Sequence, residues 1–198
     1  MNLLQFETVP AEKLILDPAE CAARLHTARG YTDSAIELCK AKLAETLDCR
    51  FCALRVHVTY PEPDTVNLGF GNIKTHALYR NLSGAPEAFL FAVTIGIGVD
   101  RLLEKLARLS PAEHFITDAL ASAYAEAACD YADKKISAGL DCLPRFSPGY
   151  GDLPLDVQPP LLAALDAGRK LGITLNKSFL MTPLKSVTAV MGIKKSLS

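Results

Sequence analysis

The chain has 198 residues, a formal net charge of −1 and 49% hydrophobic residues. This supplies a core without cross-links, and the even charge balance excludes the basic field that nucleic acid binding needs. The longest apolar runs are too short to span a bilayer, and residues 1–17 have early acids in place of a basic leader segment. We therefore expect no nucleic acid partner, no membrane partner and no signal peptide.

Six cysteines are scattered through the predicted helices and loops. In a chain of this size, without dense regular cysteine spacing, reduced thiols are the simplest interpretation. The sequence therefore predicts a cytoplasmic protein.

The first half of the chain contains alternating helix and strand signals. Apolar residues recur on one face over 33–47, which predicts a helix with Thr32 as its N-cap. Alternation over 52–60 predicts a half-buried strand, and a second strand is expected near 65–73 despite its glycines. The continuous apolar run over 89–95 predicts a central strand.

The second half begins with an amphipathic helix over 99–109. Ser110-Pro111-Ala112-Glu113 combines a capping box with proline at the first helical position, so a long helix should run to about 138. Residues 141–154 are irregular, a helix over 156–171 ends at Gly172, and the tail over 178–193 predicts two strands around Pro183.

These elements predict the fold class. Strands early, in the middle and at the end, with helices at irregular intervals, favour an α+β fold over repeated βαβ units. No repeat or long polar linker divides the sequence, so we expect a single domain over residues 1–198.

Cys49 and Cys52 have the CxxC spacing of redox and zinc sites. No second CxxC completes a zinc tetrahedron, and no helix begins at the first cysteine. At a helix-to-strand junction, cysteines are more often small buried hydrophobes, so a structural role is favoured. A redox pair in an unrelated enzyme stays open as an alternative.

The histidines and the glycine pair give weaker signals. His26, His57, His76 and His114 show no metal-ligand spacing, so no metal site is predicted. Residues 94–100, TIGIGVD, lack the third glycine of a dinucleotide fingerprint. Close packing of strand and helix is the favoured reason for the glycines, with a turn that lines a ligand cleft as the alternative.

Residues 145–152, RFSPGYGD, have the character of a binding loop. Pro148-Gly149 predicts a type II turn that lets a flat ligand approach the backbone. Arg145 can clamp a carboxylate with two hydrogen bonds, and Tyr150 offers a ring face to a cation or a purine. In this interpretation Arg145 has little structural work to do. The alternative is an ordinary loop that Arg145 anchors to the domain and whose Asp152 caps a helix.

The order of several motifs resembles the activation domain of vitamin B12-dependent methionine synthase. The matching segments are RFSPGYGD at 145–152, LGITL at 171–175 and MTPLKSV at 181–187, with weaker matches at 125–127 (AEA) and 94–96 (TIG). The likeness covers about residues 89–193. It implies a twisted, mainly antiparallel sheet flanked by helices, with a shallow groove for S-adenosylmethionine.

The resemblance also implies the residues that hold the ligand. Arg145 would bind the methionyl carboxylate, the main chain at Ser147 and Gly149 would contact the adenosine, Tyr150 would line the groove, and Glu126 would face the polar part of the ligand. A family tyrosine beyond the Ser-Val strand has no counterpart, because no tyrosine follows Tyr150. No residue of this chain is expected to be catalytic.

In that family, methyl transfer from S-adenosylmethionine drives the reductive reactivation of cob(II)alamin. This chain lacks the Asp-x-His-x-x-Gly motif of corrinoid-binding domains. The resemblance therefore implies an accessory subunit, not self-sufficient, that meets cobalamin on a partner methionine synthase or another corrinoid protein, with a flavodoxin- or ferredoxin-type electron donor. The alternative is an S-adenosylmethionine sensor or scaffold for another corrinoid methyltransferase.

Overall fold

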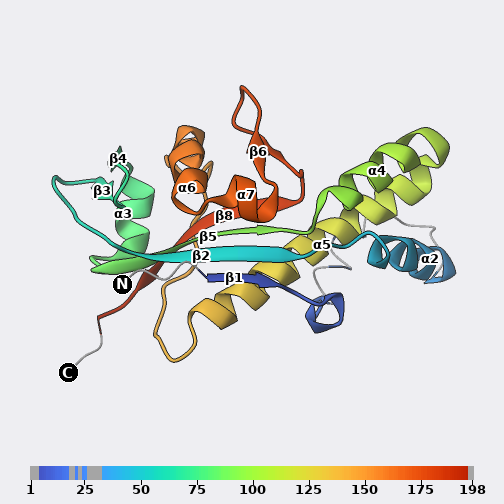
Figure 1. The fold of residues 1–198 in the computed structure, drawn as a ribbon, viewed down its shortest axis with the longest axis horizontal. Coiled ribbons are helices and arrows are strands. Elements are labelled where there is room, and N and C mark those ends of the chain that lie inside the picture. Colours follow the sequence, from blue (N-terminus) through green and yellow to red (C-terminus); the bar gives the residue numbers. More distant parts are fainter. Residues whose placement is uncertain (1–4, 18–20, 22–23, 26–32, 196–198) are drawn as a thin grey trace.

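The computed structural model describes residues 5–17, 21, 24–25 and 33–195. The main sheet is antiparallel throughout and has the strand order β1-β2-β5-β8. Its strands are β1 (Gln5–Thr8), β2 (Arg50–His57), β5 (Glu87–Thr94) and β8 (Ser186–Ile193). Helices cover both faces of this sheet (Figure 1). The predicted α+β class, with an antiparallel sheet flanked by helices, is confirmed.

Three helices pack on one face of the sheet. They are α2 (Asp33–Ala44), α4 (Ile97–Leu109) and the long α5 (Pro111–Ile136). The apolar residues of all three helices form one cluster with the alternate strand residues Phe51, Phe91 and Met191. The other face carries α3 (His76–Leu82), α6 (Gln158–Ala164) and α7 (Ala167–Leu171), which pack on Cys52, Leu90 and Val190. Because strand side chains alternate between faces, β5 is buried on both, as its continuous apolar run predicts.

Several expected elements differ in the structure. The strand expected over 65–73 is a small hairpin, β3 (Thr65–Asn67) and β4 (Asn72–Lys74), whose turn contains Gly69 and Gly71 with positive φ. The helix expected over 156–171 is a 3-10 turn, η2 (Leu155–Val157), followed by α6 and α7, because Asp166 adopts φ +51 and breaks the helix. Gly172 ends α7 in the left-handed region, as predicted.

The tail also differs from the expected strand pair. β7 (Met181–Thr182) precedes Pro183 but pairs with the short β6 (Thr174–Leu175), which was not predicted, and only β8 joins the main sheet. β1 and the 3-10 turn η1 (Ala11–Lys13) were also not predicted. The proposed N-cap Thr32 lies outside the described residues.

The glycine pair between β5 and α4 permits close packing. A Cβ at Gly96 would lie 2.8 Å from Asp48 Cβ, and one at Gly98 would lie 2.6 Å from the carbonyl oxygen of Thr46. The start of α4 therefore lies directly against the segment that leads into β2. Close packing, the favoured interpretation, is supported, although the contact is with residues 46–48.

The start of α5 forms half of the predicted capping box. Pro111 occupies the first turn, and Ser110 Oγ accepts a hydrogen bond from the Glu113 backbone N–H at 3.5 Å. The reciprocal bond is absent: the Glu113 carboxylate pairs with Lys42 at 2.5 Å, and the Ser110 N–H donates to the Leu106 carbonyl. Glu113 thus ties α5 to α2.

Candidate functional site

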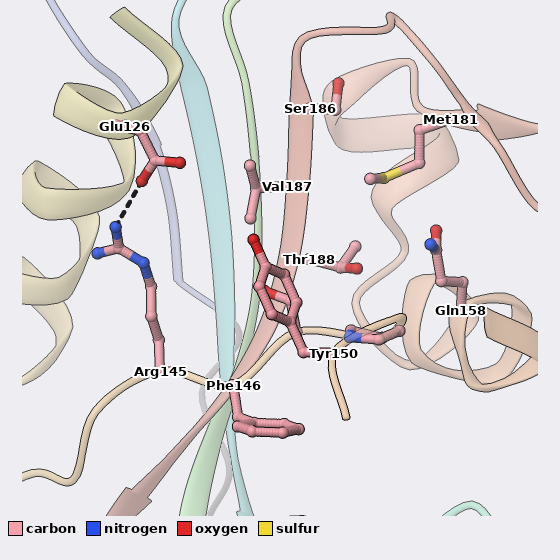
Figure 2. Close-up of a pocket in the computed structure, with 11 residues that line it drawn as sticks. Glu126, Arg145, Phe146, Tyr150, Gln158, Met181, Ser186, Val187 and Thr188 are labelled. Atoms are coloured by element: carbon pink, nitrogen blue, oxygen red, sulfur yellow. Dashed lines mark hydrogen bonds and ion pairs between the residues drawn. The ribbon is translucent and has the colours of Figure 1, made fainter. Parts of the chain in front are cut away.

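A pocket of about 410 Å³ lies where α5, the segment 145–150, the start of α6 and the strand β8 meet. Its volume is within the range of small-molecule sites. Figure 2 shows the ion pair of Arg145 and Glu126 on one side of the pocket and Gln158 and Met181 on the other, with Tyr150 between them. The lining residues are Glu126, Arg145, Phe146, Ser147, Pro148, Tyr150, Gln158, Met181, Ser186, Val187 and Thr188.

The segment 145–150 is attached to the outer edge of β8. Phe146 and Val190 exchange two backbone hydrogen bonds of 2.8 Å, as neighbouring strand residues do. Beyond Phe146 the chain turns: the Tyr150 N–H donates to the Ser147 carbonyl at 3.2 Å, and Gly149 has φ +92. This geometry agrees with the predicted Pro-Gly type II turn, which holds Tyr150 over the pocket.

Asp152 fixes the far end of the loop on α3. Its carboxylate accepts hydrogen bonds from the backbone N–H groups of His76 and Ala77 and from the Thr75 hydroxyl, at 2.8–2.9 Å. These donors lower the pKa of Asp152 to about 2, the Ala77 N–H having the largest effect. Asp152 thus caps a helix, as the alternative ordinary-loop interpretation has it, and the helix is distant in sequence.

The start of β8, which forms the pocket floor, is held from two sides. The Leu184 N–H donates to the buried carboxylate of Asp100 on α4 at 2.8 Å, and burial raises the pKa of that carboxyl. Lys185 pairs with Asp118 on α5 at 2.7 Å. Ser186 Oγ lies 2.9 Å from Thr94 Oγ1 on β5. The MTPLKSV segment is therefore rigidly placed against the sheet.

Arg145 forms an ion-pair cluster with three carboxylates of α5. Its guanidinium donates to Glu126 at 2.7 Å, to Asp130 at 2.7 Å and to Asp133 at 2.5 Å. The acids stand four and three residues apart, so they share one face of the helix. The expectation that Arg145 has little structural work is therefore wrong, because it anchors the pocket loop to α5.

The cluster carries more negative than positive charge. Burial alone would lower the pKa of Arg145, but the bonds to Asp130 and Asp133 outweigh it and the pKa is raised. Burial raises the pKa of Asp133, against the opposing effect of Arg145. Glu126 and Arg145 line the pocket, whereas Asp130 and Asp133 are not among its lining residues. The charged end thus presents an acid and a guanidinium side by side.

Two further side chains give the pocket its chemical character. Tyr150 is 68% exposed, which is unusual for an aromatic ring that packs only within its own chain. Gln158 is 5% exposed, and its Oε1 is buried without a hydrogen-bond partner among residues 5–17, 21, 24–25 and 33–195. Among the described residues that line the pocket, Gln158 has the one buried side-chain oxygen or nitrogen left without such a partner.

Four of the five site residues expected from the sequence resemblance meet at this pocket: Glu126, Arg145, Ser147 and Tyr150. Gly149 is not among the described residues that line it, and its N–H donates to the Leu153 carbonyl at 2.8 Å. Within the quoted motif at 181–187, the lining residues are Met181, Ser186 and Val187. The LGITL motif instead supplies buried core residues, Leu171 and Ile173.

Sequence reasoning missed the pocket roles of Phe146, Pro148, Gln158 and Thr188. Phe146 and Pro148 belong to the RFSPGYGD loop, so the same motif could have predicted that they line the pocket. Thr188 follows directly after MTPLKSV on β8, where alternation places it on the same face as Ser186. No comparable sequence feature indicated a pocket role for Gln158, because a single glutamine before two prolines indicates only the start of a helix.

The CxxC pair cannot act as a dithiol in this arrangement. Cys49 is buried in the cluster on one face of the sheet and Cys52 in the cluster on the other. Burial is the main cause that raises the pKa of both thiols, to about 12. The structural interpretation of these cysteines is supported, and the redox alternative loses its basis.

The histidines of the described residues lie apart. His57 is exposed near Glu87, and His76 pairs with Asp64 at 2.9 Å, while His26 lies outside the described residues. Within the described ranges, no three acidic, histidine or cysteine side chains gather as metal ligands would. None of the described helices combines the length and hydropathy needed to cross a bilayer.

A wider depression of about 740 Å³ lies between α2 and α4 and includes Gly98 among its lining residues. Long charged side chains, among them Lys42, Arg101 and Lys105, form much of its wall. None of the described buried polar atoms without a hydrogen-bond partner belongs to this depression. The pocket beside Arg145 is therefore the better candidate for a specific ligand.

Comparison with known proteins agrees with this arrangement. No protein-family model matches the chain, and no curated protein matches its sequence. Among solved structures, the MetH reactivation domain bound to AdoHcy superposes with a TM-score of 0.71 at 18% identity, over 96% of this chain and 78% of that one. The chain has the fold of the MetH reactivation domain. The resemblance inferred from the motifs is thereby confirmed at the level of the fold.

Proposed function

We propose that this chain binds S-adenosylmethionine in the pocket beside Arg145. One observation carries the proposal: two motifs about thirty residues apart in sequence, 145–152 and 181–187, supply most of the lining of one pocket. The neighbour of the same fold was solved with AdoHcy, an analogue of S-adenosylmethionine. The pocket has a charged end and a neutral amide end, which suits a ligand with a zwitterion at one end and a base at the other.

The charged end suits the amino-acid part of this ligand. Glu126 would pair with the ligand ammonium, and the acidic excess of the cluster would also favour the positive sulfonium. The ligand carboxylate would have to share the Arg145 guanidinium with Glu126 or displace it, while Asp130 and Asp133 keep the guanidinium in place. Binding would thus exchange one ion pair for two, with Glu126 moving from Arg145 to the ammonium.

The rest of the pocket would hold the nucleoside. The exposed ring of Tyr150 would stack on the base or cover the sulfonium. Adenosine contacts from the main chain would come from the segment around Ser147. At Gly149 the carbonyl oxygen is the group to consider, since its N–H is already bonded to Leu153.

We further propose that the bound ligand serves the reductive methylation of cob(II)alamin carried by a partner methionine synthase. The corrinoid supplies the metal-centred chemistry, and a flavodoxin- or ferredoxin-type donor supplies the electron. The contribution of this chain is to hold the methyl donor at the pocket mouth in one orientation, a proximity effect that requires no acid or base. The free thiols of the described cysteines fit a reducing compartment such as the cytoplasm.

Titration calorimetry of the folded protein with S-adenosylmethionine tests the first proposal. Binding at one site per chain is expected, and the absence of binding would refute it. Adding the protein, S-adenosylmethionine and a one-electron reductant to a cob(II)alamin-loaded methionine synthase without its own activation domain tests the second. Loss of the cob(II)alamin absorption is expected. Ligand binding without that loss would favour a sensor or scaffold for another corrinoid methyltransferase.

A further inference from the structure

Gln158 places a neutral amide at the end of the pocket opposite the ion pair. It is the first residue of α6, and its side chain extends from that helix toward Met181 and Thr188 (Figure 2). The residue is 5% exposed, and the amide oxygen Oε1 has no hydrogen-bond partner in the part of the chain that the structure describes. Gln158 is therefore a buried amide among the residues that line the pocket.

None of the described residues donates a hydrogen bond to the oxygen of this amide. A buried carbonyl oxygen without a donor is destabilising, because it loses its bonds to water and gains none in return. An apolar side chain of the same length would fill the space against Met181 without that cost. The described residues supply no donor to Oε1, and of the described atoms of this kind it is the one that belongs to the pocket lining, so a molecule bound in the pocket can supply the matching donor.

A primary amide presents an acceptor and a donor side by side. Adenine offers the complementary pair, an exocyclic amino donor next to a ring-nitrogen acceptor, and glutamine forms two hydrogen bonds with this edge in protein–DNA complexes. The layout of the pocket agrees: a ligand whose zwitterion meets Glu126 and Arg145 would place its other end near Gln158.

We propose that Gln158 recognises the base of the bound nucleoside and selects adenine over 6-oxopurines. This inference rests on the proposed function, because it takes S-adenosylmethionine as the ligand of the pocket. In a 6-oxopurine, an oxygen acceptor stands where adenine has its amino donor. It would leave Oε1 unpaired or force the amide to turn, and a site built to bond one group rejects an analogue that lacks it.

The test compares AdoHcy with S-inosylhomocysteine, which differs from it at the 6-position of the purine. Calorimetry should show that the wild-type protein binds AdoHcy about 10- to 100-fold more tightly than the inosine analogue. Gln158→Met keeps the length of the side chain and removes both hydrogen-bonding groups. It should weaken AdoHcy binding by a similar factor and bind the two ligands within about threefold of each other.

Asn81→Leu is the matched control. Asn81 lies on α3 outside the pocket lining and also has a buried amide oxygen without a partner. Its replacement should leave both affinities unchanged. The melting temperature of Gln158→Met should be equal to or higher than that of the wild type, since a structural role for the amide predicts a loss.

The outcomes separate the two proposals. Equal wild-type affinity for AdoHcy and S-inosylhomocysteine would overturn the role of Gln158 while leaving the ligand site intact. So would an equal loss of affinity for both ligands in Gln158→Met together with a lower melting temperature. If Gln158→Met does not fold, the wild-type preference between the two ligands decides. A folded wild-type protein that binds neither ligand nor S-adenosylmethionine refutes the proposed function itself.

Discussion

Arg145→Ala should destabilise the ligand-free protein, and the structure sets the size of the loss. The guanidinium bonds to three carboxylates, and a hydrogen bond between charged groups contributes about 1.5–3 kcal/mol when it is shielded from water. Asp130 is 60% exposed and adds little, whereas Asp133 is 23% and Glu126 38% exposed. We expect a loss of about 2–4 kcal/mol at neutral pH, or roughly 5–15 °C in melting temperature.

The loss should depend on pH in a defined direction. Burial raises the pKa of Asp133 and Arg145 opposes this effect, so without Arg145 the pKa of Asp133 in the folded protein should rise further above its unfolded value. A carboxyl group with a raised pKa binds a proton on folding, so the stability of the variant should increase as the pH falls. The difference from the wild type should therefore be largest near pH 8 and smaller at pH 5.

Thermal and urea unfolding followed by circular dichroism measure this effect. Arg169→Ala is the control, because Arg169 pairs with Asp166 on the surface with a 78% exposed side chain, and its loss should leave the melting temperature unchanged. If Arg145→Ala unfolds at the wild-type temperature at pH 8, the structural role inferred from the cluster is incorrect.

Ligand binding gives a second measurement on the same residue. Arg145→Lys keeps the positive charge but lacks the planar guanidinium with its paired N–H donors. It should therefore recover only part of the affinity for S-adenosylmethionine that Arg145→Ala loses. If Arg145 also holds the ligand carboxylate, its replacement should weaken the binding of S-adenosylmethionine more than the binding of the decarboxylated analogue. Equal weakening of both would show that Arg145 acts only as an anchor of the loop.

Three further predictions follow from the described geometry. Replacing Cys49 and Cys52 together by alanine should leave ligand binding unchanged and cost about 1–3 kcal/mol of stability, and Ellman's reagent should not react with either thiol in the native protein at pH 8. Asp152→Asn should lower the melting temperature at pH 7 but not near pH 2, because a lowered pKa stabilises the fold above about pH 4 and the benefit disappears as the carboxylate is protonated. Tyr150→Ala should weaken S-adenosylmethionine binding by about 1–3 kcal/mol with an unchanged melting temperature, and a lower melting temperature would mark the ring as structural.

Local sequence patterns determined much of the fold. The continuous apolar run of β5 predicted its double burial, and the Ser110-Pro111 start of α5 and the Gly172 end of α7 followed from capping chemistry. The Pro148-Gly149 turn was predicted for the same reason, because its geometry depends on residues that are adjacent in sequence.

Ordered motifs also indicated the site before its geometry was known. The segments at 145–152 and 181–187, with Glu126, were singled out through the resemblance to the methionine synthase activation domain, and they meet at one pocket. The antiparallel sheet implied by the same resemblance is the sheet observed. A motif carries this information because its residues are needed together in space, although nothing local in the chain brings them together.

Only the tertiary structure decided what each side chain faces. The sequence could not show that Cys49 and Cys52 lie on opposite faces of the sheet, that Asp152 caps a helix far away in the chain, or that three acids of α5 surround Arg145. Nor could it reveal Gln158, whose proposed role depends on the lack of a partner for its amide oxygen among the described residues. Burial and pairing are properties of segments distant in sequence, and free energies of hydrogen bonds and ion pairs follow from those contacts rather than from residue type.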